Sequence, residues 1–314
     1  MTRSRAVFPS IARPVRPRRS LAAIDTPPAP RLRYFGWWLP AMLAAWAVTV
    51  LPLVERPVEA AAAFWPLVLV GVAGAALGNA SAVGGGLIFV PVMVLVYRVD
   101  PVASLQIALV GQSFGMTSGA LGWLRRREVP LGALPVAVPA LLVGGTLATL
   151  VVRPSPLLVK GLFGPVSVLV GLLVLILLNH PERELREVPR RAWPWLALVA
   201  LGGGVLTGWV AIGEGEVIAA FLMLAYGLAP SRGIGLGTVL LSVNSIYLAL
   251  LHALFVGGVR WEMAAFVALG CVFGGRLGPF LAQRVGPRRL KVGFAVLAIA
   301  DGLLMIWQAV RSLP

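Results

Sequence analysis

Two clusters of glycine interrupt long apolar stretches of this sequence, at residues 84–86 and 213–216. Glycine weakens a helix by about 1 kcal/mol per residue, so each cluster is expected to break the helix around it. A helix that begins inside such a stretch presents unpaired N–H groups and the positive end of its dipole, and glycine lets an anion approach these donors closely. The clusters therefore predict a site for a small anion, although glycines also serve close helix packing. The glycines expected to line this site are Gly84, Gly85, Gly86, Gly213 and Gly215.

Two acidic side chains, Glu214 and Glu216, belong to the second cluster. Beside a bound anion they would repel the ligand unless they were protonated, and removal from water favours the neutral form of a carboxyl group. We therefore expect Glu214, Glu216 or both to carry a proton that is coupled to anion movement. Two alternatives stay open: the acids cap the second half-helix, whose N-terminal dipole suits negative charge, or they admit a cation as the substrate.

Other polar side chains within apolar stretches could complete the site. Asp301, in the middle of the last stretch, is expected either to take part in proton coupling or to form a structural ion pair. Arg276 could pair with the anion, with Glu214 or with Asp301, or its side chain could extend to the aqueous surface. We expect no catalytic residue and no metal ligand. The residues expected to contact the substrate, for which hydrogen bonding between helices is the alternative, are Asn79, Ser81, Ser113, Thr238 and Ser242.

The composition places these clusters in a membrane. Of the 314 residues, 59% are hydrophobic and 12% are charged. A soluble domain has about 25% charged residues, so this chain has too little polar surface to cover a water-soluble core. Stretches of about 20 apolar residues, the length that spans a bilayer, recur along the chain. The expected fold class is all-α, a polytopic bundle of transmembrane helices.

The net charge of +15 would indicate a nucleic-acid partner in a soluble protein. Here the arginines lie in the N-terminal tail and in short loops between apolar stretches, so they report orientation in the membrane and no nucleic-acid partner is expected. Cys271 is the only cysteine, which excludes an intrachain disulfide. No cofactor is expected.

Two apolar stretches, residues 64–97 and 195–226, are too long for one simple spanning helix, and each contains one glycine cluster. The stretches correspond, because Gly84 and Gly213 are 129 residues apart and Gly144-Gly145 recurs 130 residues later. Further pairs at a spacing of 129 are Pro101 with Pro230 and Ser113 with Ser242. The series predicts two copies of one structural unit.

The positive-inside rule decides how the broken stretches run. If each crossed the membrane fully, the arginines at 125–127 and 183–191 would lie on the side opposite to the arginine-rich N-terminus. If each instead returns to the side from which it started, all three groups are cytoplasmic. We therefore predict two inverted repeats, each with a broken re-entrant hairpin plus three spans, preceded by one extra helix. Two copies in parallel orientation are the alternative.

Five parts follow from this division. The tail at residues 1–33 has eight arginines and many prolines, so it is expected to be disordered and cytoplasmic; a transit peptide is the alternative, but prolines break the helix that one needs. The expected location is the plasma (inner) membrane, with several passes and a cytoplasmic N-terminus. The remaining parts are an extra transmembrane helix at 34–63, the first repeat at 64–179, a cytoplasmic linker at 180–194 and the second repeat at 195–314.

Several short motifs are informative as a set, namely Gly84-Gly-Gly-Leu-Ile-Phe-Val-Pro91, Ile234-Gly-Leu-Gly-Thr238, Val256-Gly-Gly-Val-Arg-Trp261 and Gly274-Gly-Arg-Leu-Gly278. In this order and spacing the chain resembles the sulfite exporter TauE/SafE family over nearly everything after residue 64. Members of that family are permeases associated with sulfite, organosulfonates and related sulfur compounds, so the resemblance implies a small oxyanion substrate. The chain departs from the family pattern at Glu214 and Glu216, where the pattern favours small neutral residues.

We therefore expect a secondary transporter of a small anion, and the resemblance implies an exporter of sulfite, an organosulfonate or a related sulfur compound. The sequence contains no GxxxxGK[ST] or HExxH motif, so an enzyme is not expected. A passive anion channel is the first alternative, and an intramembrane enzyme or a structural membrane protein is the second. The expected partners are the anionic substrate and the lipid bilayer; an oligomer is compatible with the sequence but not indicated by it.

Overall fold

The computed structural model describes residues 36, 38–81, 84–178, 185–285 and 287–311. Within these ranges the chain is helical and contains no strand, only an isolated bridge between Leu185 and Leu228. The predicted all-α fold class is confirmed. The predicted N-terminal tail and the first part of the predicted linker lie outside the described residues.

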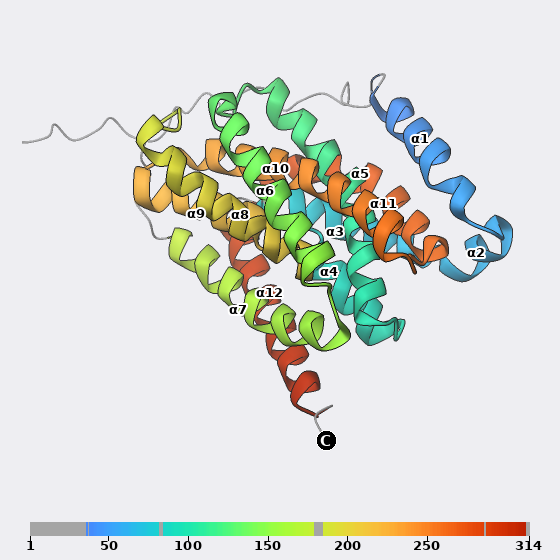
Figure 1. The fold of residues 1–314 in the computed structure, drawn as a ribbon. Coiled ribbons are helices and arrows are strands. Elements are labelled where there is room, and N and C mark those ends of the chain that lie inside the picture. The colour runs from blue at the N-terminus through green and yellow to red at the C-terminus, as the bar shows by residue number, and fades with distance from the viewer. Residues whose placement is uncertain (1–35, 37, 82–83, 179–184, 286, 312–314) are drawn as a thin grey trace, which may run out of the picture. The chain divides into compact units, whose positions relative to one another are not determined.

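The leading segment consists of two helices where one was expected (Figure 1). Helices α1 (Trp38–Thr49) and α2 (Pro57–Phe64) flank a short 3₁₀ turn, and the chain direction changes by 107° between them. Proline at position 57 has no N–H to continue the first helix, and the charged Arg56 precedes it in an exposed ion pair with Glu59. The bend therefore has a local cause that a hydropathy pattern does not reveal.

The first half of the protein begins with α3 (Pro66–Ser81), which ends just before the first glycine cluster. Helix α4 (Gly86–Pro91) restarts the chain within the cluster and continues as a π-helical turn, so the helical stretch runs from Gly86 to Val96. The remaining helices of this half are α5 (Pro101–Arg125), α6 (Leu134–Thr146) and α7 (Pro156–Leu178).

The second half repeats this order of elements. Helix α8 (Trp193–Val210) ends before the second glycine cluster, and α9 (Glu214–Phe221) starts within it and also continues as a π-helical turn. The predicted helix breaks at both clusters are therefore confirmed. The remaining helices are α10 (Pro230–Leu251), α11 (Trp261–Val285) and α12 (Pro287–Arg311).

The second broken segment returns to the side from which it starts. Before α8, the backbone N–H of Leu185 donates to the carbonyl oxygen of Gly227 at 3.3 Å, and the N–H of Ala229 donates back to Leu185 at 2.8 Å. The guanidinium group of Arg191 also lies 5.9 Å from the ring centroid of Tyr226. The beginning of α8 and the end of the helix that follows the break are thus neighbours, so this segment forms a hairpin.

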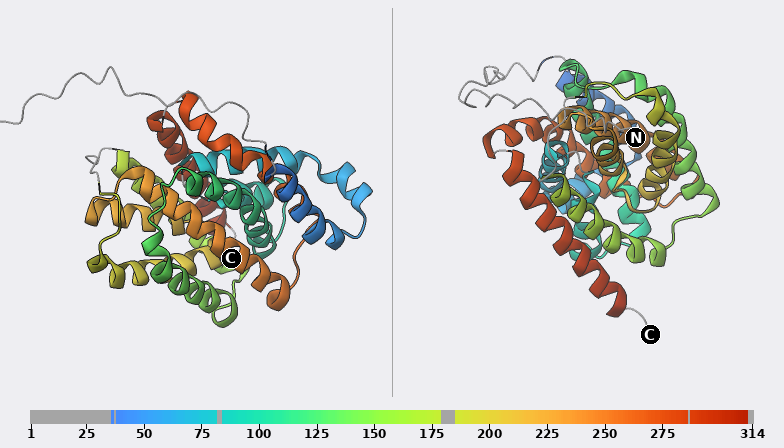
Figure 2. Two further views of the ribbon diagram at one scale, coloured as in Figure 1. Left: turned by 90° about the horizontal axis from the view of Figure 1, so that it is seen from above. Right: turned by 90° about the vertical axis from the view of Figure 1, so that its left-hand side faces the viewer.

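The two halves pack against each other in a reciprocal way (Figures 1 and 2). Helix α3 lies along α11 and α8 lies along α6, while α7 and α12 pack together. Glycines make the long crossings close, because a Cβ atom on Gly204 of α8 would lie 2.1 Å from the carbonyl oxygen of Leu141 on α6. A Cβ on Gly274 of α11 would lie 2.3 Å from the carbonyl oxygen of Val72 on α3.

Helices α5 and α10, the corresponding spans after each hairpin, run antiparallel to each other. Near the start of α5, Gln106 Nε2 donates to the carbonyl oxygen of Gly257, beyond the end of α10, at 2.8 Å. In the middle, the hydroxyl groups of Thr117 and Ser242 lie 2.8 Å apart. Inverted repeats would pair their equivalent spans in this way, but the inverted relation itself stays a prediction.

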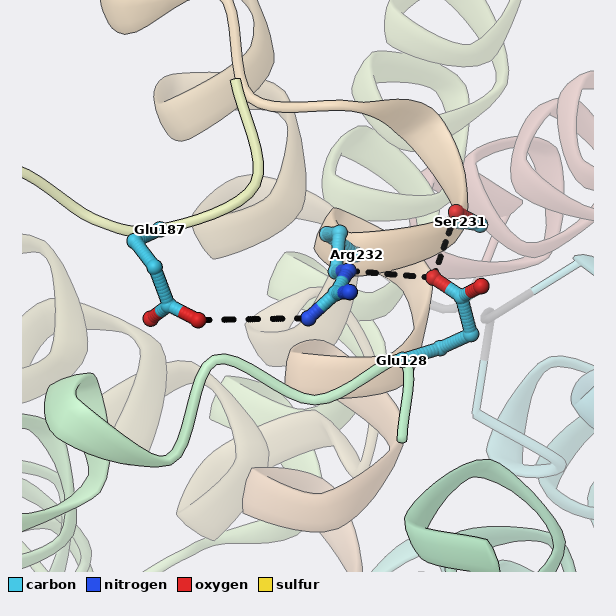
Figure 3. A network of polar contacts seen from close by, with 4 residues as sticks. All are labelled: Glu128, Glu187, Ser231 and Arg232. Carbon is cyan, nitrogen blue, oxygen red and sulfur yellow. Dashed lines mark hydrogen bonds and ion pairs between the residues drawn. The ribbon is translucent and has the colours of Figure 1, made fainter. Parts of the chain in front are cut away.

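A polar network joins three segments at the end of α5 and the start of α10 (Figure 3). Glu128, after α5, accepts from Arg232 Nε at 3.1 Å and from the Ser231 hydroxyl at 3.0 Å. Arg232 also lies 4.0 Å from Glu187, which precedes α8. The network links the first half, the linker and the second half, at a position where all three are predicted to be cytoplasmic.

Within the described residues, five helices are long and apolar enough to cross a membrane, or six if the bent leading pair forms one span. Helix α5 is not among these five, although it has 25 residues, because it carries polar side chains such as Gln106 and Gln112. Both are buried inside the protein. The five helical stretches that are long and apolar enough to cross a membrane are Leu131–Val151, Pro156–Leu178, Arg190–Val210, Pro230–Val256 and Val292–Arg311.

The close crossing of α6 and α8 predicts the effect of a single methyl group. Gly204→Ala should lower the thermal unfolding midpoint in detergent, because the methyl group would overlap Leu141 and overpacking costs about 1 to 3 kcal/mol. Gly202→Ala is the matched control on the same helix, since its Cβ would meet no atom within 4 Å. Equal midpoints for the two variants would contradict this packing.

The network around Arg232 predicts a second difference in stability. Arg232→Gln removes one partner of a partly buried ion pair and should cost about 1 to 3 kcal/mol of unfolding free energy. Arg56→Gln breaks an ion pair whose side chains are 75% and 72% exposed, and it should change stability by less than about 1 kcal/mol. Thermal unfolding of both variants measures the difference, and a larger loss in Arg56→Gln would contradict the assignment.

Candidate functional site

The tips of the two broken segments meet in the interior of the protein. The backbone N–H of Gly84, at the first break, donates to the carboxyl oxygen Oε1 of Glu216 on α9 at 3.0 Å. These residues are 132 positions apart in the chain, and both are buried. A backbone donor from one glycine cluster thus binds a carboxyl group from the other.

Glycine at the first tip is required by the closeness of this contact. A Cβ atom on Gly86 would lie 2.3 Å from the carbonyl oxygen of Ala211 and 2.8 Å from Nε2 of Gln112. A Cβ on Gly84 would lie 3.2 Å from the same Gln112 nitrogen. Because real Cβ atoms do not approach other atoms as closely as 2.3 Å, a larger residue at position 86 would push the two tips apart.

The second tip depends on two residues in the left-handed region of backbone conformation. Ala211 has φ of 57° and Gly213 has φ of 98°. The N–H of Ala211 still donates to Thr207 at 3.0 Å, which ends α8, and the chain then reverses into α9. The left-handed conformation costs a non-glycine residue roughly 1 to 2 kcal/mol, so Ala211 stores strain at this turn.

Gln112 of α5 holds the second tip in place. Its Nε2 donates to the carbonyl oxygen of Ala211 at 2.7 Å, and its Oε1 accepts from the Ser245 hydroxyl of α10 at 3.1 Å. A carbonyl group at the end of α8, which the broken helix cannot satisfy, therefore has a side-chain partner. Gln112 joins α5, α10 and the α8–α9 turn through two hydrogen bonds.

Glu214 and Glu216, which were predicted as coupling groups, lie in the first turn of α9. Both also accept hydrogen bonds from other segments of the protein. Glu214 is fully buried, and its Oε2 accepts from Nδ2 of Asn244 on α10. Gly203 of α8 lies under this side chain, because a Cβ there would be 3.2 Å from Cγ of Glu214. Helix capping and proton coupling both remain compatible with these contacts.

Three buried oxygen atoms around this pair have no hydrogen-bond partner among the described residues. They are Oε1 of Glu214, Oε2 of Glu216 and Oδ1 of Asn244. A buried polar atom without a partner is costly, and it marks a place where a proton, water or ligand can bind. The oxygen atoms belong to two carboxyl groups and one amide, so they can bind a proton, a water molecule or a cation.

The other residues predicted to contact the substrate have hydrogen bonds elsewhere. Asn79 donates to the carbonyl oxygens of Ala75 and Gly115, at 2.9 and 3.0 Å, which ties α3 to α5. Ser113 and Thr238 donate to carbonyl groups within their own helices, and Ser242 pairs with Thr117. The side chain of Ser81 lies outside the described residues. Gly215 packs closely on α10, where a Cβ on Gly237 would lie 2.7 Å from its carbonyl oxygen.

Asp301 and Arg276, which were expected near the site, lie on other helices. Asp301 belongs to α12, whose main packing partner is α7. The guanidinium group of Arg276 on α11 lies 5.0 Å from the ring centroid of Trp38. Neither residue forms a described hydrogen bond or ion pair with Glu214 or Glu216. No cluster of three or more His, Cys, Asp or Glu side chains that could hold a metal ion occurs in the part of the chain that the structure describes.

The residues expected from the sequence to contact the substrate did not include Gln112 or Asn244. Each is polar, lies in an apolar helix and stands within two positions of a residue that was selected, Ser113 or Ser242. Successive positions on a helix point about 100° apart, so the neighbour of a chosen residue faces a different surface. The available signal was the amide side chain itself, which is costlier to bury in an apolar helix than a hydroxyl group that can bond to its own backbone.

Two interrupted helices that meet inside a multi-pass helical membrane protein are typical of membrane transporters. The profile of the sulfite exporter TauE/SafE family matches residues 67–305, so the chain belongs to this family. It is also similar to the probable membrane transporter protein YjnA of Bacillus subtilis (strain 168), with 24% identity over 256 residues that cover 76% of this chain and 98% of the relative. No solved structure shows a significant match. The protein is therefore an integral multi-pass membrane protein of a transporter family, with a small-molecule substrate.

The meeting of the tips predicts the effect of one methyl group at the first break. Gly86→Ala should separate the tips, because its Cβ would overlap Ala211, and substrate flux into proteoliposomes should fall by about fivefold or more for a strain of about 1 to 3 kcal/mol. Gly161→Ala is the matched control, since no atom lies within 4 Å of its Cβ. Size-exclusion profiles check that both variants remain folded. Normal flux in Gly86→Ala would show that the tips need not be in contact.

Proposed function

We propose that this protein is a secondary transporter of a small oxyanion, with sulfite or an organosulfonate as the substrate, and that proton movement through Glu214 and Glu216 is coupled to transport. The observation that carries the proposal is the hydrogen bond from Gly84 N–H to Glu216. A carboxylate is itself an oxyanion, so a backbone donor of the first hairpin already binds a group of the proposed chemistry. The family description supports sulfite as the first substrate to test.

Recognition of the oxyanion would depend on backbone donors at the broken helices. The stretch Gly86–Val96 points its N-terminal end toward the second tip, so its dipole favours negative charge there. Glycines leave these donors uncovered, and Gln112 holds the opposing tip at a fixed distance. Such donors select for oxygen atoms and charge, which sulfite and sulfonates share.

Proton coupling is supported by the surroundings of the two carboxyl groups. Their described hydrogen bonds come from a backbone N–H and an amide, which are both uncharged donors. A second negative charge beside them would be repelled in a low-dielectric interior. Protonation of one or both groups would remove this repulsion, so anion and proton would move together.

The predicted inverted relation of the repeats would supply the mechanism of alternating access. Two inverted halves can exchange the conformations of their hairpins and so expose a central site to either side in turn. The antiparallel pairing of α5 and α10 supports this relation. We propose a cytoplasmic N-terminus because the arginines of the tail and loops then lie on one side of the membrane. We propose the plasma membrane as the location. Outward transport is proposed from the family description, sulfite exporter.

A cation is the second candidate ligand of this site. It would act either as the coupling ion in place of the proton or as the substrate in place of the anion. It is favoured by one observation, the three unpartnered oxygen atoms on Glu214, Glu216 and Asn244. Carbonyl and carboxylate oxygens are suitable ligands for hard cations. The transport assay described next distinguishes the cation from the proton, because it compares an imposed sodium gradient with an imposed pH gradient.

The test is uptake of radiolabelled sulfite into proteoliposomes with and without an imposed pH gradient. We expect accumulation above equilibrium when the outside is acidic, and its loss when a protonophore is added. Flux that only equilibrates would indicate a passive anion channel. Accumulation that follows a sodium gradient and ignores the pH gradient would favour the cation candidate.

The double variant Glu214→Gln with Glu216→Gln tests the coupling groups. We expect it to lose gradient-driven accumulation, because an amide cannot carry the coupled proton. Glu55→Gln is the control, since this carboxyl group is exposed on the segment between α1 and α2. Undiminished, still gradient-driven accumulation in the double variant would overturn the proposed role of these acids.

A further inference from the structure

We propose that Glu216 is a built-in competitor of the transported anion. Its carboxylate occupies a backbone donor of the first hairpin, and the substrate takes this donor only when Glu216 is protonated and withdraws. The inference rests on the proposed function and adds the step by which proton and anion are linked. It concerns Glu216 alone, whereas Glu214 is bound to α10.

The first argument is the position of the carboxyl group. Oε1 of Glu216 lies 3.0 Å from the nitrogen of Gly84, a normal distance for an N–H···O hydrogen bond. The side chain is 4% exposed, and its second oxygen, Oε2, has no partner among the described residues. One oxygen is therefore bound where a substrate oxygen would be, and the other is available to a proton.

The second argument is that the first tip has no room for two oxyanions. Even a methyl group on Gly84 would lie 3.2 Å from both Gln112 Nε2 and Leu241 Cδ2, and one on Gly86 would lie 2.3 Å from the oxygen of Ala211. An oxyanion with three oxygens is larger than a methyl group. The carboxylate must leave the Gly84 donor before such an anion can bind there.

The third argument is the charge around Glu216. Helix α9 packs against α7, α8 and α10, and α4 packs against α3, α5 and α12. Glu214 precedes Glu216 by two positions, so protonation of either group relieves their mutual repulsion. The titratable or charged residues of the packed helices are Lys160 on α7, Arg232 and Tyr247 on α10, Arg125 on α5, Asp301 in the middle of α12, and Arg288, Arg289, Lys291 and Arg311 near the ends of α12.

These residues have positions or partners away from the Gly84 donor. Arg232 binds Glu128 at the start of α10, and Tyr247 shares a hydrogen bond of 2.6 Å with Thr146. Lys160 is in the first turns of α7 and Arg125 is the last residue of α5. Asp301 has no described bond to Glu216. Glu216 and Glu214 are thus the acids at the tips whose charge decides whether the donor is free.

Proton binding and anion binding are coupled because the Glu216 carboxylate and the anion exclude each other from the Gly84 donor. Above the pH at which Glu216 loses its proton, the carboxylate and the substrate compete for one donor, and anion affinity is low. Below that pH the neutral carboxyl group is a weaker acceptor, and the anion displaces it. Protonation thus raises the affinity for the anion, and binding of the anion favours the protonated form of Glu216.

The experiment measures anion binding to the purified full chain in nanodiscs. The probe is radiolabelled methanesulfonate, because a sulfonate keeps one charge between about pH 5.5 and about pH 8.5, whereas sulfite itself titrates in this range. For the unaltered protein we expect affinity to rise by about tenfold or more as the pH falls across this range. Binding of methanesulfonate is also expected to take up protons from a weakly buffered solution.

Glu216→Gln is the decisive variant. We expect it to bind methanesulfonate at about pH 8.5 at least about tenfold more tightly than the unaltered protein, with little change as the pH falls. Glu216→Asp retains the charge but shortens the side chain, so it should bind more tightly at high pH and keep a pH dependence. Glu55→Gln, the exposed control, should behave like the unaltered protein.

Three results would overturn the inference. If Glu216→Gln binds with unaltered affinity and pH dependence, or binds more weakly, Glu216 is not a competitor, although the proposed transport of anions stands. If Glu216→Gln does not fold, Glu216→Asp is used in its place, and an affinity at high pH equal to that of the unaltered protein would also show that Glu216 is not a competitor. If neither the unaltered protein nor any variant binds methanesulfonate or sulfite at any pH, the proposed substrate class fails and the inference fails with it.

Discussion

The low dielectric of a membrane interior requires that buried polar groups find partners within the protein, and this structure meets that requirement at the place where it breaks two helices. Each break leaves backbone groups that the helix can no longer satisfy. Gly84 of the first tip donates to Glu216 of the second, and Gln112 of α5 donates to the carbonyl oxygen of Ala211 at the second tip. The reciprocal packing of the halves and the close glycine crossings bring the tips to within bonding distance.

The same arrangement leaves some buried polar atoms at the tips without hydrogen-bond partners, and these atoms are candidates for binding protons or ligands. Ala211 is held in a left-handed conformation, and oxygens of Glu214, Glu216 and Asn244 stay unpartnered in the described structure. Such features lower stability, so they persist in proteins mainly where they serve binding or movement. Satisfied groups in this protein fix the position of the tips, and unsatisfied groups are the ones that we propose exchange protons and anions.

The helix breaks could be predicted from the sequence because their cause is local: glycine triplets and clusters weaken a helix wherever they occur, and the spacing of 129 residues marked the second break. The bend of 107° in the leading segment was missed, since hydropathy does not resolve the effect of Pro57. Gln112 and Asn244 were not selected as substrate contacts because helix rotation, which decides the neighbour that faces the tips, is set by packing. Asp301 and Arg276 looked equally suitable in sequence, but neither forms a described hydrogen bond with Glu214 or Glu216, and Arg276 lies against Trp38. The inverted relation of the repeats stays a prediction.

The central claim is that a small oxyanion binds where the two hairpin tips meet. The most direct measurement is anomalous diffraction from crystals of the full chain soaked with selenite at acidic pH, because selenium marks the position of an oxyanion that resembles sulfite. The account predicts a selenium peak within hydrogen-bond distance of the Gly84 backbone nitrogen, with Glu216 displaced from its position in the present structure. A peak found only beside the arginines of the predicted cytoplasmic loops, with the Gly84–Glu216 bond intact, would contradict it.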